Sequence, residues 1–416
     1  AMTAHTGCNT VYGSTPANTP HTYPWMNSLF QDGATIGWLV GESFIYDHAR
    51  RSVLPERFAD LLIGGISDYT EHDYFVYTHF TDMDMTDLEV LELPKVWAVG
   101  GDGGMGDIGF QNVSKVVMQN RPNVKIMLLD TQVYSNTGGQ NSESSPMPGG
   151  FDMNQFGVAT QGKHTERKSV AEAFMSGHGS AYVAQVSLAN SGTLYKALLD
   201  GLYYRGTAFY QTYTACMPEH GIPDHAAELQ ALHIRDSRGM PEFVFNPSNG
   251  ETYFDALDIK TNQSFKTDWA QKMTPVTKKR YTYTTAHWAF TEARFRFHHK
   301  VITKEQAEGM VRLEDKIKLV TMDDIIHRRP TDKNHRSYIE DFGVYTIDYD
   351  AVGAEIYRTL SIQMVLFVVE RRKAWRILQS RAGVENKDYL DQKALLTKID
   401  KEGLSVEAAL DEPALV

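Results

Sequence analysis

The sequence predicts an α/β fold with a mostly parallel sheet flanked by helices, followed by a mainly helical C-terminal extension. Two observations support this prediction. In the first half of the chain, short apolar runs that end in glycine or polar residues alternate with segments of helical periodicity, a pattern typical of parallel sheets whose strands are joined by helices. From Trp269 onward, charged residues become more frequent, glycine becomes rarer and the helical pattern predominates.

The composition is that of an ordinary globular protein. The 416 residues are 42% hydrophobic and 22% charged, which is enough for a sizeable core and for two or three domains. A net charge of −11 disfavours a nucleic-acid-binding surface. We expect no membrane contact and a cytoplasmic location, because residues 1–14 are too polar for a signal peptide and the best apolar run, residues 362–369, is too short to cross a bilayer.

The central prediction concerns residues 96–140, VWAVGGDGGMGDIGFQNVSKVVMQNRPNVKIMLLDTQVYSNTGGQ. Residues 96–99 form a short apolar run stopped by glycines, and residues 124–129 form a second run of the kind buried on both faces of a parallel sheet. Three valines between the runs fall at helical spacing, namely Val113, Val116 and Val117. The segment therefore predicts two parallel strands joined by a right-handed helical crossover.

Both predicted strands are followed by polar residues that offer oxygen donors. Gly101-Asp102-Gly103 ends the first strand and Thr131 follows the second. Ligands of parallel sheets bind beyond the carboxyl ends of the strands, so Asp102 and Thr131 should meet at one edge, with the carbonyl of Val133 beside them. A few oxygen ligands completed by phosphate oxygens are typical of Mg2+. A GDG turn alone is better explained as a nucleotide-binding or merely tight βα turn. The 28 residues between Asp102 and Thr131 are enough for a helix and a strand, and this spacing favours a metal and a diphosphate.

The remaining elements follow from the same patterns. Further helices are predicted at residues 42–62, 170–177, 193–204 and 226–232, and further strands at residues 181–188 and 207–213. The C-terminal helices are predicted at residues 288–300, 303–319 and 351–378, with weaker ones at 392–401 and 405–409. Lys163 lies in a basic patch typical of a solvated loop, and it is a secondary site candidate only because its segment resembles a GK-x-T-x-x-K segment near the cofactor cleft of a known family. His220 is more often a structural hydrogen-bonding residue than a ligand.

The central segment resembles the thiamine diphosphate motif, and DTQVYSNTGGQ is similar to the DTEVYSNTGGQ segment of the long single-chain pyruvate:ferredoxin (flavodoxin) oxidoreductases. Four other segments resemble this family in the same order over residues 6–222: TGCNTVYGSTPANTP, WMNSLFQDGATIG, GGDGGMGDIGF and YTACMPEHGI. The resemblance implies that Asp102, Thr131 and the carbonyl of Val133 hold Mg2+. It also implies that Asn136 is catalytic, beside the thiazolium and the oxo acid. The residues implied to bind the cofactor are Gly101, Asp102, Gly103, Thr131, Val133 and Asn136.

The two cysteines, Cys8 and Cys216, both lie in segments that resemble the family. The residues alone allow two buried free thiols or one disulfide. In the resembled enzymes these positions help to ligate a four-iron, four-sulfur (4Fe-4S) cluster, which takes four thiolates. The family's upstream Cys-x-x-Cys pair is not in this sequence. Either the chain is a piece, another chain supplies the pair, or the cluster is absent. Cluster ligation predicts sulfurs within about 10 Å of each other.

The resemblance implies oxidative decarboxylation of a 2-oxo acid, expected to be pyruvate, to an acyl-CoA, with electrons passing through iron–sulfur clusters to ferredoxin or flavodoxin. In the family, the glutamate that activates thiamine comes from a different domain, and no segment here resembles that domain. We therefore expect an oligomer with the remaining domains or subunits, and an inactive isolated chain. Two departures weaken the activity assignment: Gly104 replaces a bulky residue, and CMPEHGI is one residue longer than usual.

The expected organisation is a thiamine diphosphate- and Mg2+-binding α/β domain over residues 1–225, a transition segment over residues 226–267, and the helical extension over residues 268–416. Two alternative functions stay open. One is a non-catalytic scaffold or assembly subunit that retains this fold, and the other is a thiamine-dependent carboligase without redox centres.

Overall fold

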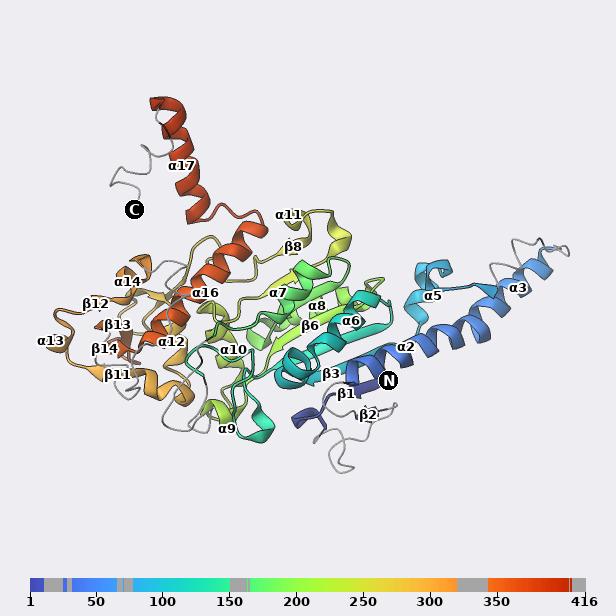
Figure 1. The fold of residues 1–416 in the computed structure, drawn as a ribbon, viewed down its shortest axis with the longest axis horizontal. Helices are drawn as coiled ribbons and strands as arrows, with labels where there is room; N and C mark the ends of the chain where they lie inside the picture. The colour runs from blue at the N-terminus through green and yellow to red at the C-terminus, as the bar shows by residue number, and fades with distance from the viewer. Residues whose placement is uncertain are drawn as a thin grey trace.

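The computed structural model of the chain describes residues 1–10, 25–27, 32–65, 70, 78–149, 163, 165–319, 343–403 and 405. In Figure 1, a central α/β body carries a helical arm on one side and a projecting C-terminal helix on the other. The arm consists of α2 (Gly33–His48) and α3 (Leu54–Ile63), joined by a π-helical turn, and the projecting helix is α17 (Lys387–Glu402). Within the described part of the chain, no helix is both long enough and apolar enough to cross a membrane.

The body is built on an eight-stranded sheet with strand order β2-β1-β3-β4-β6-β5-β7-β8. Pairing is parallel from β2 through β5 and antiparallel at β5–β7 and β7–β8. The strands are β1 Met2–Ala4, β2 Trp25–Asn27, β3 Val96–Gly101, β4 Val124–Asp130, β5 Tyr182–Val186, β6 Ala208–Tyr213, β7 Phe243–Phe245 and β8 Leu257–Asp258. This arrangement confirms the predicted mostly parallel α/β fold.

Helices cover both faces of this sheet. On one face, Ala34 of α2, the valines of α6 (Phe110–Gln119) and Phe174 of α7 (Val170–Gly177) share a core with β3, β4 and β6. On the other face, α8 (Ser191–Tyr203) packs Ala197 against aromatic residues of β5 and β6. The predicted crossover is confirmed, since all three α6 valines are at most 1% exposed. Burying each of them contributes about 1.5–3 kcal/mol.

The sheet extends beyond the residues expected to carry it. Strands β7 and β8 come from residues 226–267, the expected transition segment, and Phe243 and Leu257 join the core of the body. Helix α10 (Ala227–Asp236) lies in the same segment, close to the predicted helix at 226–232. The domain boundaries themselves stay a prediction.

The C-terminal part contains more β-structure than predicted. It adds a hairpin of β9 and β10 and a four-stranded sheet of order β11-β14-β13-β12. These strands are β9 Ala270–Met273, β10 Arg280–Tyr283, β11 His299–Ile302, β12 Val311–Arg312, β13 Val344–Tyr349 and β14 Glu355–Leu360. The helices are α12 Thr285–Ala289, α13 Lys304–Ala307, α14 Leu313–Leu319, α16 Ile362–Arg381 and α17. The helical C-terminus is confirmed for α16 and α17.

Three predicted C-terminal helices are wrong in part, for identifiable reasons. The helix predicted at 351–378 begins only after the Ser361 side chain, which accepts a hydrogen bond from Met364 N; the preceding residues pair as β14. The capping box at Thr303 is confirmed, but its helix ends at Ala307, before Gly309 at φ +89°. The helix predicted at 288–300 breaks at Glu292, which adopts an extended backbone and turns its carboxylate into the interior.

Candidate functional site

The turn after β3 delivers a carboxylate into the interior. Residues Asp102–Ile108 form a wide π-helical turn, a feature frequent at functional sites. The Asp102 side chain is buried, with only 1% of the residue exposed. A Cβ added to Gly103 would overlap the ring of Tyr134, so only glycine fits where this turn meets the loop after β4.

The loop after β4 brings two further oxygen atoms to Asp102. Thr131 Oγ1 lies 3.0 Å from Asp102 Oδ1 and 3.0 Å from the carbonyl oxygen of Val133. The Thr131 N–H also donates to Asp102 Oδ1, at 3.3 Å. The parallel pairing of Gly101 with Leu129 places the two strand ends side by side. The structure thus brings together the three residues that the sequence placed at one edge of the sheet.

The electrostatics of this cluster favour a cation. Burial, followed by the charge of nearby Asp130, raises the pKa of Asp102 to about 7, against the opposing effect of hydrogen bonds from Ser142 and Thr131. Its Oδ2 accepts a hydrogen bond from the Ser142 hydroxyl. A carboxylate, a hydroxyl and a carbonyl are the hard oxygen donors that Mg2+ prefers. The residues present therefore fit a divalent cation whose remaining ligands come from phosphate and water.

These residues line a cavity of about 180 Å³. Its walls come from four places: residues 6–9, the turn at 101–104, residues of the 129–137 loop, and Thr214. The predicted site residues that line it are Cys8, Gly101, Asp102, Gly103, Thr131, Val133 and Asn136. Cys216 is the one predicted site residue that does not line the cavity.

The two cysteines are free and lie near this cavity. Cys8 Sγ is 3.8 Å from Asn136 Oδ1 and can donate a weak hydrogen bond to it. Cys216 follows β6 and precedes the short helix α9 (Met217–His220). Burial raises the pKa of the Cys8 thiol, and the charge of Cys216 is close enough to raise it further. Among the described residues, no group of three or more His, Cys, Asp or Glu side chains could hold a metal ion. The 10 Å limit on the sulfurs stays a prediction.

The two secondary candidates support the site from outside the cavity. Lys163 Nζ donates to the carbonyls of Ser142, Glu143 and Ser145, at 3.0, 3.3 and 3.4 Å. It thereby holds the loop that carries Ser142 against Asp102. His220 is buried, and its Nε2 lies 2.7 Å from the Thr131 carbonyl oxygen. Burial lowers the pKa of His220 to about 4, so the ring is neutral at pH 7 and acts as a hydrogen-bonding residue.

Sequence reasoning missed several residues that hold the site. Asp130 forms a fully buried ion pair with Arg167, at 2.7 Å, directly before Thr131. Ser142 supplies the second hydrogen bond to Asp102, and Arg294 reaches the loop from the C-terminal part. The position of Asp130 at the end of an apolar run was a usable local signal, as was Arg167 in the basic patch. Arg294 has no local signal, since its partner lies 162 positions away.

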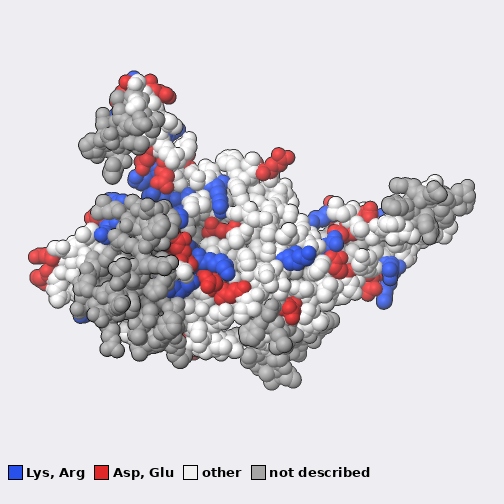
Figure 2. All heavy atoms as spheres, viewed as in Figure 1, with Lys and Arg blue, Asp and Glu red and all other residues white. Residues whose placement is uncertain are grey.

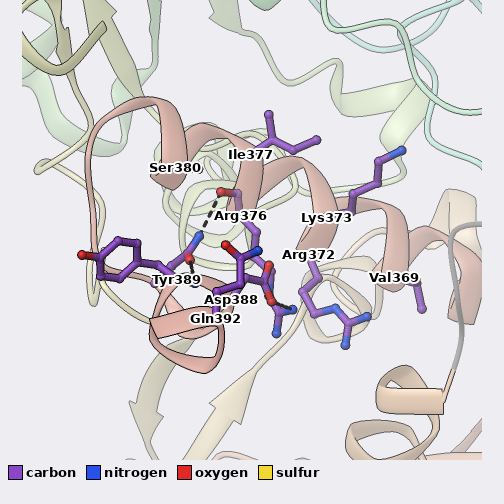
Figure 3. Close-up of a pocket in the computed structure, with 10 residues that line it drawn as sticks. Val369, Arg372, Lys373, Arg376, Ile377, Ser380, Asp388, Tyr389 and Gln392 are labelled. Atoms are coloured by element: carbon purple, nitrogen blue, oxygen red, sulfur yellow. Dashed lines mark hydrogen bonds and ion pairs between the residues drawn. The ribbon is translucent and has the colours of Figure 1, made fainter. Parts of the chain in front are cut away.

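A larger cavity, of about 420 Å³, lies between α16 and α17 and is drawn in Figure 3. Two of its three basic residues are engaged within the chain: Arg376 pairs with Asp268 and Asp388, both at 2.7 Å, and Lys373 lies 4.0 Å from Glu166. Basic and acidic atoms accordingly adjoin each other where α16 and α17 meet in Figure 2. We assign no ligand to this cavity, because its charges are largely compensated internally.

Comparison with known proteins defines the class of the domain. Residues 89–209 match the family described as thiamine pyrophosphate enzyme, C-terminal TPP binding domain. The match covers β3, the turn with Asp102, β4 and the loop with Thr131, Val133 and Asn136. Residues 89–209, at the centre of the body, are therefore similar to a thiamine diphosphate-binding domain.

Relatives that match more than half of the chain are named as oxidoreductases. It is 32% identical over 271 residues to the "Probable pyruvate-flavodoxin oxidoreductase" of Escherichia coli (strain K12), covering 59% of this chain and 22% of that protein. It is 28% identical over 303 residues to the pyruvate:ferredoxin oxidoreductase of Moorella thermoacetica, covering 62% and 24%. A solved 2-oxoglutarate:ferredoxin oxidoreductase from Magnetococcus marinus aligns with 16% identity and a TM-score of 0.34, over 52% of this chain and 55% of that one. The predicted resemblance is confirmed, although the chain spans less than a quarter of these curated relatives.

Proposed function

We propose that the chain supplies the diphosphate- and metal-binding half of the active site of a 2-oxo acid oxidoreductase, with pyruvate as the expected substrate. The observation that carries the proposal is the position of Thr131 Oγ1, which lies 3.0 Å from both Asp102 Oδ1 and the Val133 carbonyl oxygen. These three oxygen atoms converge at the floor of a cavity, within the residues that match a thiamine-binding domain.

In this proposal Asp102, Thr131 and the Val133 carbonyl hold Mg2+. The Thr131 hydroxyl would keep its hydrogen and offer an oxygen lone pair to the metal, and diphosphate oxygens would supply further ligands. The absence of a side chain at Gly103 lets the turn pack against Tyr134 beneath the ligand. Thiamine diphosphate, when bound, supplies the nucleophilic carbon and the electron sink for decarboxylation.

Asn136 is the proposed catalytic residue. Its Oδ1 accepts from Cys8 Sγ, at 3.8 Å, so its amide Nδ2 is the group that donates to the oxo acid. Donation to the carbonyl oxygen of the substrate would orient the oxo acid and stabilise the negative charge that develops on that oxygen. Both residues line the same cavity as the proposed metal ligands, which supports this role.

The remaining machinery is proposed to lie outside this chain. The chain covers 22% and 24% of the two oxidoreductases compared, so CoA binding, the ferredoxin or flavodoxin contact and the activating glutamate belong to other domains or subunits. A 4Fe-4S cluster held by Cys8 and Cys216 would need two further thiolates from them. The isolated chain is expected to show no pyruvate-dependent dye reduction; turnover by the purified chain alone would contradict this division of the site.

Metal and cofactor analysis of the purified native assembly tests the function. We expect thiamine and magnesium in stoichiometric amounts, together with iron and acid-labile sulfide. Thiamine without iron would instead indicate the redox-free carboligase. Neither thiamine nor iron would indicate the non-catalytic scaffold and would refute the proposal.

A further inference from the structure

Of two paired charged side chains in the C-terminal part, one reaches the loop that carries Thr131 and Val133. Glu292 and Arg294 follow α12 and are 1% and 0% exposed. Arg294 Nε donates to Glu292 Oε2 at 2.6 Å, and Arg294 Nη2 donates to the Gln132 side-chain oxygen at 2.8 Å. Gln132 lies between Thr131 and Val133, two of the three residues proposed to ligate the metal. A direct side-chain connection thus joins the C-terminal part to the metal loop.

Gln132 adopts a backbone conformation that its surroundings must enforce. Its φ is +61°, a left-handed value that residues other than glycine rarely take. Its N–H donates to Asp130 Oδ1 at 3.0 Å, and its carbonyl accepts from Ser145 Oγ at 2.5 Å. With the bond from Arg294, the backbone and the side chain of Gln132 are both held. The left-handed backbone at Gln132 turns the chain so that the Thr131 hydroxyl and the Val133 carbonyl lie close together.

A second connection runs from Glu292 to the same loop. Glu292 Oε1 accepts from the Tyr213 hydroxyl at 3.0 Å. That hydroxyl lies 3.4 Å from His220 Nδ1, and His220 Nε2 lies 2.7 Å from the Thr131 carbonyl oxygen. Glu292 is therefore linked to this loop in two ways. Hydrogen bonds connect it through Arg294 to the Gln132 side chain. It also holds Tyr213, whose ring stacks on the ring of His220, and His220 donates from Nε2 to the Thr131 carbonyl.

Stability alone is a poor explanation for this buried pair. Replacing a buried ion pair by apolar residues is often neutral or stabilising, because the desolvation of the charges offsets their attraction. Arg294 Nη1 has no hydrogen-bond partner among the residues that the structure describes, which adds to that cost. A costly network that ends on the metal loop is better explained by the geometry it imposes there.

We propose that Glu292 and Arg294 are positioning residues for divalent-metal binding, acting through Gln132 and the Thr131 carbonyl. The proposal rests on the function proposed above for Asp102, Thr131 and Val133. Both positioning residues lie outside residues 89–209, so the metal affinity of the matched domain depends on a segment beyond it. Loss of an outer partner of a metal ligand typically weakens metal binding about 10–100-fold.

Manganese binding in the presence of thiamine diphosphate tests this proposal, using electron paramagnetic resonance of free Mn2+ on the native assembly. Gln132→Ala removes the acceptor of the Arg294 bond and leaves the charged pair intact. We expect Mn2+ to bind this variant about 10-fold more weakly than the wild type. Gln132→Glu keeps an acceptor oxygen for Arg294, so it should bind Mn2+ at least as tightly as the wild type.

Two further variants complete the test. Gln271→Ala, which removes an exposed amide bonded to Thr282, is the matched control and should leave Mn2+ affinity unchanged. Arg294→Lys retains a charge beside Glu292 but lacks the planar fork that contacts two partners, so it should resemble Gln132→Ala. Urea unfolding of every variant checks that affinity and stability change independently.

The outcomes separate this proposal from the function on which it rests. Wild-type protein that fails to bind Mn2+ with thiamine diphosphate would overturn both. If the wild type binds but Gln132→Ala binds equally well, only the positioning role is overturned. Equal losses in Gln132→Ala and Gln132→Glu would also overturn it, because the Glu variant preserves the contact with Arg294.

Discussion

Replacing Asp102 by asparagine is expected to abolish retention of thiamine diphosphate with Mg2+. Asp102 is the one carboxylate among the three proposed ligands, so the variant leaves two neutral oxygens to hold a divalent cation. Loss of an outer partner of a metal ligand typically weakens metal binding about 10–100-fold, and we expect the loss of Asp102 itself to weaken Mg2+ binding by more than that. Isothermal titration of the native assembly with thiamine diphosphate and Mg2+ measures the change.

The same substitution should stabilise the metal-free fold. The pKa of Asp102 is raised to about 7 by burial and by Asp130, so the native state binds its proton more tightly than the unfolded state does. The ionised Asp102 carboxylate therefore destabilises the native state. This effect is absent below about pH 4, the pKa in the unfolded state, grows as the pH rises towards 7, and is complete above pH 7. Above pH 7, Asp102→Asn should raise the free energy of unfolding by on the order of 4 kcal/mol.

A buried acid away from the cavity provides the control for both effects. Asp82 is 8% exposed but pairs with Arg121, at 3.0 Å, and does not line the cavity. Asp82→Asn should leave cofactor retention unchanged and should not stabilise the fold. Retention by Asp102→Asn equal to that of this control would contradict the assignment of Asp102.

Removing the positive charge of Arg167 should destabilise the protein by about 3–5 kcal/mol, because it leaves the buried Asp130 carboxylate without its cation. Arg167 Nη2 and Asp130 Oδ2 are 2.7 Å apart, with side chains 2% and 0% exposed. Gln211 also donates to this oxygen, at 2.6 Å, but carries no charge. Urea unfolding of Arg167→Met at pH 7 measures the loss.

An exposed ion pair gives the matched comparison. Lys196 and Asp200 pair on α8, with side chains 75% and 37% exposed. Lys196→Met should change the free energy of unfolding by no more than about 1 kcal/mol. If Arg167→Met lowers the free energy of unfolding by no more than Lys196→Met does, Arg167 is not needed to stabilise the buried Asp130 carboxylate.

The part of the fold that could be predicted is the part specified by local signals. The glycines after residue 99 stop a strand, the α6 valines mark one helix face, and residues 124–129 are apolar enough for burial on both sides. Because parallel strands present their carboxyl ends at one edge, these signals also predicted that Asp102 and Thr131 meet. The family resemblance then supplied the cofactor, which spacing alone left open.

The parts that could not be predicted depend on distant partners. Glu292 interrupts a helical pattern because its carboxylate accepts from Tyr213, which lies 79 positions away, so the sequence around Glu292 does not indicate that contact. The residues of β14 were assigned to the helix predicted at 351–378. Their alternation of apolar and polar residues is too short to indicate a strand, and their pairing with β13 is seen only in the structure. The support of the metal loop by Arg294 belongs to the same class of long-range contact.

The most direct test of the account is the position of a bound metal. Crystals of the native assembly grown with Mn2+ and thiamine diphosphate should show an anomalous peak beside the β3 and β4 strand ends. We expect the peak within about 2.0–2.3 Å of Asp102 Oδ1, Thr131 Oγ1 and the Val133 carbonyl oxygen. Thiamine diphosphate bound with its metal held by any other set of protein oxygens would contradict the central claim.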